Sequence, residues 1–456
     1  MSDPPGPRFV VVGGGPAGVS AATIAAARGA EVTVVEASVV GGAAHLWDCI
    51  PSKAMVASSM RLDSLRSAVR LGIGGVGDPE VDMKAMSTRA DALSDRLSAS
   101  TTDLLEAQEV RILRGYGRFT GAHDLAVALE DGEEAVEFDF ALVSTGSRPR
   151  VPDWAEVDGE RILTTRHAYH LDEVPEHMVI IGSGVTGVEF VHIFASMGSQ
   201  VTLLVSRHHV LPHRDPEVAA ALEEDFLDRG VVLLKGARAD SARRTDDGVV
   251  VTAEDGRRVV GSHVLLAVGS EANTERLGLD TAGIEVDGRG FVVVVDEYQR
   301  TSVPHIYAAG DVTGQMPLSS VATMQGRKIA GHLMGDQTKP LDYSKVSEAI
   351  FSEPEIASVG LKEVDARAEG RKVRITKVPF AANPRALIQG NPTGFAKVVS
   401  DPATHVILGG TIVGHHASEL IGILALAVQA GIRVDVLVET LMVHPSLTES
   451  LADAAD

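Results

Sequence analysis

The chain has 456 residues, and its 41 Lys and Arg against 62 Asp and Glu give a formal net charge of −21 at pH 7. Because so negative a chain repels nucleic-acid phosphates and anionic lipid, we expect neither nucleic acid nor a membrane surface as a partner. Hydrophobic residues at 45% and charged residues at 23% are typical of a globular protein and exclude a disordered or fibrous chain, and the length predicts roughly three domains.

The first predicted element is a β-branched run followed by a glycine turn. Residues 9–37 read FVVVGGGPAGVSAATIAAARGAEVTVVEA, which predicts a strand, a turn at Gly13, Gly15 and Gly18, a helix of about three turns and a second strand. The first glycine makes the tight turn, the second lets the backbone approach a pyrophosphate, and the third lets helix and strand pack closely. Glu36 ends the second strand and suits a ribose 2′-hydroxyl. This βαβ unit predicts a dinucleotide site.

Helices and then short strands are expected after the first unit. Residues 57–115 carry helical spacing, and residues 110–146 alternate as short strands that end at Ser144-Thr145-Gly146. A composition break at RPRVP, residues 148–152, marks a domain boundary.

The second predicted dinucleotide site repeats the first. Residues 178–206 read MVIIGSGVTGVEFVHIFASMGSQVTLLVS, again a strand, a glycine turn, a helix and a strand. The glycines of the first copy, Gly13, Gly15, Gly18 and Gly29, fall on Gly182, Gly184, Gly187 and Gly198. Two such units in one chain predict two bound dinucleotides.

The two copies differ where the second strand ends. The position of Glu36 is taken by Val205, which is followed by Ser206, Arg207 and two histidines. A missing acid with a nearby arginine favours a 2′-phosphate, so the second unit predicts NADPH over NADH. The alternative is that Arg207 lies in a merely solvated loop. Because no cysteine and no spaced histidine and carboxylate set accompanies the histidines, we expect no metal site.

The remainder of the chain completes an α/β fold. Residues 235–310 predict strands with turns, and after Lys339-Pro340 come further strands and an apolar helix over 417–431. The predicted architecture is two Rossmann-like dinucleotide-binding domains and a C-terminal α+β domain. The expected domain ranges are 1–148, 149–268, 269–340 and 341–456.

A single cysteine, Cys49, excludes an intramolecular disulfide and therefore a dithiol couple within one chain. The N-terminus lacks the basic and apolar regions of a secretory signal, and the apolar stretch 420–428 is too short to span a bilayer. We therefore expect a cytoplasmic protein without a membrane span.

Many ordered motifs together resemble one family. They are GGGPAGVSAA, CIPSK (49–53), STGSRP (144–149), GSGVTGVEF, AVGSEANTERLGL, YAAGD (307–311), FSEPEIASVGL (351–361), PFAANPRA (379–386) and HPSLTE (444–449). The chain resembles the FAD-dependent pyridine nucleotide-disulfide oxidoreductases of the dihydrolipoamide dehydrogenase and glutathione reductase type, over nearly its whole length.

The resemblance implies FAD on the first unit and NAD(P)H on the second. It makes 1–148 the first part of the FAD-binding domain, 149–268 the NAD(P)H-binding domain, 269–340 the second part of the FAD (central) domain and 341–456 the interface (dimerisation) domain. Glu36 would bind the FAD ribose and Asp311 would lie near its ribityl chain, while Glu189 and Lys53 would form an ion pair beside the flavin. It also implies a homodimer in which His444, oriented by Glu449, reaches the partner chain's flavin. The further cofactor positions it implies are Gly42, Gly117, Thr145, Gly146, Ser147, Gly269, Leu318 and Ser319 for FAD, and Ser206 and Arg207 for the nucleotide.

The chain departs from the family at the redox disulfide. Where members read G-G-T-C-x-x-x-x-C, this sequence reads GGAAHLWDC, so Ala44 stands at the distal, substrate-attacking cysteine and only the flavin-side Cys49 remains. Disulfide exchange needs an attacking thiolate and a resolving partner, and Ala44 supplies neither. The chain looks most like members that lack the disulfide and act as NAD(P)H quinone reductases.

The sequence thus predicts hydride transfer from NADPH, with NADH as the alternative, to FAD and on to a quinone. Cys49, His444 and Glu449 are the predicted catalytic residues, and His444 is the general acid. Three alternatives stay open: Cys49 forming a mixed disulfide with a small thiol, a nicotinamide transhydrogenase, and a non-catalytic subunit. A purely structural interpretation also remains for Cys49, for the His444–Glu449 pair and for the Lys53–Glu189 pair. His45 and Trp47 could likewise either form a platform for the acceptor or simply pack in a helix.

Overall fold

The computed structural model describes residues 6–77 and 79–456 and divides into two compact units. Among the described residues, unit 1 comprises 6–52, 87–150 and 269–341, and unit 2 comprises 53–77, 79–86, 151–268 and 342–456. Within the described ranges, no helix combines the length and the apolar character needed to cross a membrane.

Unit 1 is built on a five-stranded parallel sheet in the order β18-β7-β1-β2-β3. Its strands are β1 Arg8–Val12, β2 Glu31–Glu36, β3 Arg111–Arg114, β7 Phe140–Val143 and β18 Ile306–Ala308. Alternation along β1 divides its side chains between two cores. Phe9 and Val11 join one apolar cluster with α1 (Pro16–Ala26), whereas Val10 and Val12 join another on the opposite face.

Further elements of unit 1 cover this sheet. Helix α6 (Ser319–Leu333) packs so closely on α1 that a Cβ at Gly326 would lie 2.1 Å from the Ala17 carbonyl oxygen. A small antiparallel sheet contains β4 Tyr116–Phe119, β5 Asp124–Leu129 and β6 Gly132–Glu137, and a two-stranded sheet pairs β8 Ser147–Pro149 with β17 Ser270–Ala272. Helix α3 (Met83–Glu106) lies mainly in this unit.

Unit 2 contains a second five-stranded parallel sheet, in the order β12-β11-β10-β16-β9. Its strands are β9 Ile162–Thr164, β10 His177–Ile181, β11 Gln200–Val205, β12 Val232–Lys235 and β16 His263–Leu266. Helices α4 (Val185–Met197) and α5 (Pro216–Asp228) follow β10 and β11. An antiparallel sheet of β13 Ala239–Thr245, β14 Gly248–Ala253 and β15 Arg258–Gly261 contacts β9, β10 and β16 of the parallel sheet. Helix α2 (Ile50–Ser67) lies mainly in this unit.

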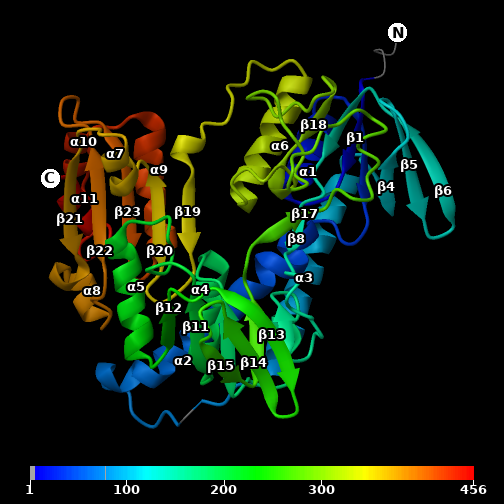
Figure 1. Ribbon diagram of the computed structural model, residues 1–456. Helices are drawn as coiled ribbons and strands as arrows, with labels where there is room; N and C mark the ends of the chain where they lie inside the picture. Colours follow the sequence, from blue (N-terminus) through cyan, green and yellow to red (C-terminus); the bar gives the residue numbers. More distant parts are fainter. Residues whose placement is uncertain (1–5, 78) are drawn as a thin grey trace. The chain divides into compact units, whose positions relative to one another are not determined.

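The C-terminal part of unit 2 is an antiparallel sheet in the order β19-β20-β23-β22-β21, with helices around it (Figure 1). The strands are β19 Ser347–Ile350, β20 Ile356–Gly360, β21 Arg374–Pro379, β22 Phe395–Ser400 and β23 Ile407–Val413. Helix α9 (Ala417–Ala430) is the expected apolar helix and packs on this sheet through Leu420 and Leu424. The shorter helices are α7 Glu363–Ala368, α8 Pro384–Ile388, α10 Val434–Val438 and α11 Glu449–Ala455.

The predicted fold class is confirmed, because both repeats form a parallel βαβ unit and an α+β region ends the chain. Two local expectations need correction. The helical stretch over 57–115 is broken after Leu71, where the glycine-rich segment from Gly72, with φ +80°, ends the helix. Within 235–310, residues 273–305 form turns and isolated bridges rather than strands. The four domain ranges stay a prediction.

Candidate active site

The glycine turn of unit 1 has room for a Cβ atom at one of its three glycines and no room at the other two. A Cβ on Gly13, whose φ is +106°, would lie 2.4 Å from the Ser144 carbonyl oxygen, and a Cβ on Gly18 would lie 2.1 Å from the Gly13 carbonyl oxygen. Gly15 differs, because no atom lies within 4 Å of the position its Cβ would take. Packing therefore requires Gly13 and Gly18, whereas Gly15 keeps an open approach to the backbone.

The second turn has the same geometry. A Cβ on Gly182 would lie 2.2 Å from the Ala267 carbonyl oxygen, one on Gly187 would lie 1.8 Å from the Gly182 carbonyl oxygen, and one on Gly184 would meet nothing within 4 Å. Helices α1 and α4 begin after Gly15 and Gly184, which give their first turns no side-chain cap. Their first-turn amides are therefore available to an anion such as a pyrophosphate.

The two turns differ in charge at the ends of β2 and β11. Glu36 is 8% exposed, and its carboxylate accepts hydrogen bonds from the Gly14 amide at 2.7 Å and the Ser38 amide at 2.8 Å. Burial raises the pKa of Glu36 in spite of these bonds. The equivalent Val205 is buried, and Ser206 and Arg207 follow it on the exposed surface.

A second group of predicted FAD residues gathers around Asp311. The Ser147 hydroxyl donates to Asp311 Oδ2 at 2.8 Å, and burial raises the pKa of this carboxyl group. Thr145 donates through its hydroxyl to the Asn273 carbonyl, and the Asn273 amide donates to the carbonyl of Gly146, whose φ is +69°. Leu318 and Ser319 begin α6, again without a side-chain cap.

Cys49 lies between a short π-helix, Ala44–Asp48, and α2. Its Sγ is 3.1 Å from the Ser319 hydroxyl, and its amide donates to the Ala44 carbonyl at 3.2 Å. The backbone near it packs on the first turn, because a Cβ on Gly42 would lie 3.0 Å from the Gly15 Cα. Ala44, which the resemblance aligns with the distal cysteine of the family, carries a methyl group.

Two predicted glycines serve different purposes in the structure. A Cβ on Gly117, in β4, would lie 3.3 Å from side-chain atoms of Val12 and Leu125, so this glycine permits close packing on β1. Gly269 has φ +98° and open space at its Cβ position. Its carbonyl accepts the Arg150 amide.

In unit 2, Lys53 and Glu189 form an ion pair. Lys53 Nζ lies 2.8 Å from Glu189 Oε2, and the two side chains are 33% and 7% exposed. Glu189 Oε1 accepts the amide of Phe351 at 3.0 Å, and Lys53 Nζ lies 4.9 Å from the centre of the Phe351 ring. Sequence reasoning missed Phe351, which it recorded only as part of a motif.

The predicted acid pair is also formed. His444 Nδ1 lies 2.8 Å from Glu449 Oε1, and the Ser446 amide donates to Glu449 Oε2 at 2.8 Å. The Ser446 amide and the His444 side chain lower the pKa of Glu449, which stays an acceptor that fixes the imidazole. The His444 side chain is 71% exposed.

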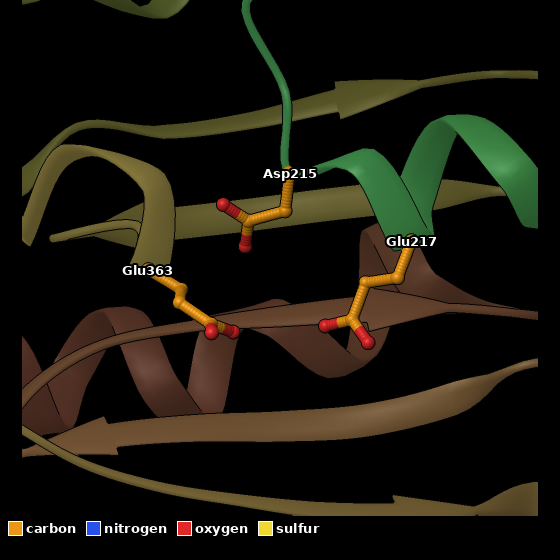
Figure 2. A group of neighbouring side chains, drawn as sticks. All are labelled: Asp215, Glu217 and Glu363. Carbon is orange, nitrogen blue, oxygen red and sulfur yellow. The ribbon is translucent and has the colours of Figure 1, made fainter. Parts of the chain in front are cut away.

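Three carboxylates outside these groups come together at the start of α5 and α7. Figure 2 shows Asp215, Glu217 and Glu363 turned toward one another, with ligand atoms within 4.8 Å. The ammonium group of Lys397, which is 1% exposed, bonds to all three, at 2.6 Å from Glu217 Oε1 and 3.3 Å from Glu363 Oε2. Asp215 also accepts the Val364 amide at 2.9 Å. A lysine, rather than a metal ion, thus satisfies this cluster.

The predicted site residues fall into two sets, one in each unit. Unit 1 contains Gly13, Gly15, Gly18, Glu36, Gly42, Cys49, Gly117, Thr145, Gly146, Ser147, Gly269, Asp311, Leu318 and Ser319. Unit 2 carries Lys53, Gly182, Gly184, Gly187, Glu189, Ser206, Arg207, His444 and Glu449. The structure also adds Gln325, which sequence reasoning missed; its side chain accepts the Gly310 amide beside Asp311 at 2.7 Å.

Family models match almost the entire chain. The model of the pyridine nucleotide-disulphide oxidoreductases matches residues 7–326, and that of their dimerisation domain matches residues 346–455. The chain belongs to this family, as the sequence motifs predicted. It is an FAD-dependent oxidoreductase that uses NAD(P), and its dimerisation domain supports a homodimer. The open glycine turns at two uncapped helices fit two dinucleotides.

Individual relatives span its full length. It is 42% identical to an NAD(P)H dehydrogenase (quinone) of Mycobacterium tuberculosis, over 98% of this chain and 93% of that protein. It is 36% identical to a dihydrolipoyl dehydrogenase of Halobacterium salinarum, over 99% and 96%. Among solved structures, LpdA of Mycobacterium tuberculosis aligns with a TM-score of 0.94 at 41% identity, over 98% of this chain and 99% of that one. A flavoprotein disulfide reductase, RclA, of Escherichia coli aligns at 0.89 and 26%, over 99% of both chains.

Proposed function

We propose that the protein transfers a hydride from NADPH to bound FAD and passes both electrons to a quinone. The observation that carries this proposal is Ala44: the chain has one cysteine, Cys49, and the position of the second thiol holds a methyl group. Electrons therefore have no disulfide within the chain to reduce. The relative named NAD(P)H dehydrogenase (quinone) supports the choice of acceptor.

Each group of the site has a role in this proposal. The amides at the start of α1 bind the FAD pyrophosphate, and Glu36 binds its ribose. The amides at the start of α4 bind the NADPH pyrophosphate, and Arg207 pairs with its 2′-phosphate. FAD, when bound, supplies the chemistry of accepting a hydride and releasing two electrons.

Lys53 and Glu189 orient the reacting cofactors for the hydride step. Glu189 is nearly buried and holds Lys53 Nζ at 2.8 Å, so the ammonium group keeps a defined position. Cys49 and Ser319 line the position where other family members hold their disulfide, as the resemblance implies.

His444 supplies a proton to the acceptor. A quinone takes two electrons and two protons to become a hydroquinone, so a general acid near it accelerates the reaction. Glu449 accepts from His444 Nδ1, which leaves Nε2 as the atom that donates. In the homodimer we place this pair beside the partner chain's flavin. We further propose that the protein is cytoplasmic, where NADPH is available.

The test is NADPH oxidation by the purified, FAD-loaded enzyme, with menadione and lipoamide as parallel acceptors. Rapid menadione reduction without lipoamide reduction is the expected result. Cys49→Ser should leave menadione turnover within about threefold of the parent, because its thiol is not an electron carrier here. Ala44→Cys is the variant to compare with Cys49→Ser, because it adds a second thiol to the chain instead of removing the first.

Three outcomes would refute the proposal in different ways. Lipoamide turnover that disappears in Cys49→Ser would show that this thiol works alone through a mixed disulfide. Preferential reduction of a second nicotinamide dinucleotide would show a transhydrogenase. Slow flavin reduction by NADPH with every acceptor would indicate a non-catalytic subunit.

A further inference from the structure

Phe351 contacts both members of the Lys53–Glu189 pair through different parts of its structure. Its backbone amide donates to Glu189 Oε1 at 3.0 Å, while Lys53 Nζ lies 4.9 Å from its ring centre. Glu189 uses its other oxygen, Oε2, for Lys53 at 2.8 Å. The three residues thus form a closed set in which each contacts the other two.

Three separate elements bring these residues together within unit 2. Lys53 is in the first turns of α2, Glu189 is in α4, and Phe351 directly follows β19. Lys53 has four rotatable side-chain bonds and is 33% exposed, so an ion pair alone leaves it several positions. A ring face beside the ammonium group attracts it and restricts those positions.

The segment that carries Phe351 is itself fixed to the C-terminal sheet. Glu355 accepts the amide and hydroxyl of Ser418, at the start of α9, at 3.0 and 2.9 Å. Its carbonyl accepts the Gly414 amide at 2.8 Å, and Ser352 donates to the Pro354 carbonyl. Phe351 also lies inside the range that matches the dimerisation-domain model, residues 346–455.

We propose that Phe351 is a positioning residue through which the dimerisation domain holds Lys53 and Glu189 in place for the hydride step. The inference rests on the proposed function, which assigns that pair to the hydride step. It adds a third member to the pair and gives the dimerisation domain a part in cofactor chemistry besides joining two chains.

The test measures flavin reduction by NADPH in a single turnover of the FAD-loaded enzyme without any acceptor. Phe351→Leu removes the ring but keeps the backbone amide and much of the apolar bulk. We expect the limiting reduction rate to fall about three- to tenfold, the range of a partly exposed cation–π contact, while the apparent dissociation constant of NADPH stays unchanged. Phe351→Tyr keeps the ring face and should stay within twofold of the parent.

The chain offers a matched control. Lys377 Nζ lies 5.1 Å from the ring centre of Phe395 in β22, so Phe395→Leu removes a similar cation–π contact, and some packing, from the same apolar cluster that Phe351 contacts. This variant should reduce its flavin at the parent rate. In Lys53→Met, the added change Phe351→Leu should cost no further rate, because the ring then has no cation to hold.

Several results would overturn the inference. The first is a Phe351→Leu variant whose flavin is reduced at the parent rate. The second is a flavin-reduction rate that falls equally in Phe351→Tyr or in Phe395→Leu. The third is a double variant, Lys53→Met with Phe351→Leu, in which the two losses of rate add. If Phe351→Leu does not fold, Phe351→Met takes its place with the same expectations. This test uses no acceptor, so it can be read even if the proposed function fails. An enzyme whose flavin is reduced rapidly by NADPH but that does not turn over menadione would refute the proposed function and would leave the Phe351 comparison valid.

Discussion

Gly15 and Gly184 provide a direct test of the two dinucleotide sites, because the structure separates cofactor approach from packing. Both have ordinary backbone angles, φ −75° and −76°, which alanine adopts without strain. Neither Cβ position has a neighbouring atom within 4 Å. Gly15→Ala and Gly184→Ala should therefore fold and meet resistance only from a bound cofactor.

The expected energies follow from this geometry. An alanine restricts the unfolded chain and stabilises the fold by about 0.4–1 kcal/mol, whereas its weaker preference for the start of a helix costs up to about 1 kcal/mol. These opposing effects largely offset each other, so the free energy of unfolding of the apoprotein should change by no more than about 1 kcal/mol. A methyl group between backbone and pyrophosphate costs about 1–3 kcal/mol, which weakens binding about fivefold to more than a hundredfold.

The assay compares retained FAD, the apparent affinity for NADPH and the apoprotein melting curve. Gly15→Ala should lose FAD while Gly184→Ala keeps it and binds NADPH less tightly. Gly18→Ala is the contrasting variant, because its Cβ would lie 2.1 Å from the Gly13 carbonyl oxygen and should destabilise the apoprotein itself. Full FAD retention by Gly15→Ala, or a melting point as low as that of Gly18→Ala, would refute the reasoning.

Three further predictions concern charge. Arg207→Ala should lower the NADPH over NADH preference about tenfold to a hundredfold in steady-state kinetics, because a phosphate loses a charged partner; an unchanged preference would show a solvated loop. Lys397→Met should lower the free energy of unfolding, measured by urea titration at neutral pH, by about 3 kcal/mol, because it leaves buried Asp215 without its cation. In an Asp215→Asn background the same substitution should lower it clearly less. Burial raises the pKa of Glu353 to about 7, so the native state binds the extra proton and stability falls as pH rises between about 4.5 and 7. Glu353→Gln should therefore raise the melting temperature at pH 8 and change it little at pH 4; a gain at both would contradict this.

Local patterns in the sequence were sufficient to predict the dinucleotide-binding architecture. Strand and helix periodicity act within a few residues, and the turn needs a glycine at Gly13 whatever surrounds the chain, because its φ is +106°. The exchange of Glu36 for Val205 between the two copies could likewise be read by alignment, as could Ala44 at the distal cysteine. These features depend on residue type at a fixed spacing.

Other features depend on which distant segments meet, and only the tertiary structure decided them. Lys397 lies 182 positions from Asp215 in the chain, and nothing in the local sequence of either predicts that a buried ammonium group joins them. The same holds for the ring of Phe351 beside Lys53 and for the Ser319 hydroxyl near the Cys49 thiol. Periodicity and glycine spacing state how each segment folds, whereas side-chain partners are set by the packing of whole elements. The sequence by itself therefore determined the cofactor class, and the tertiary structure determined which distant side chains contact one another, because those contacts depend on how whole elements pack.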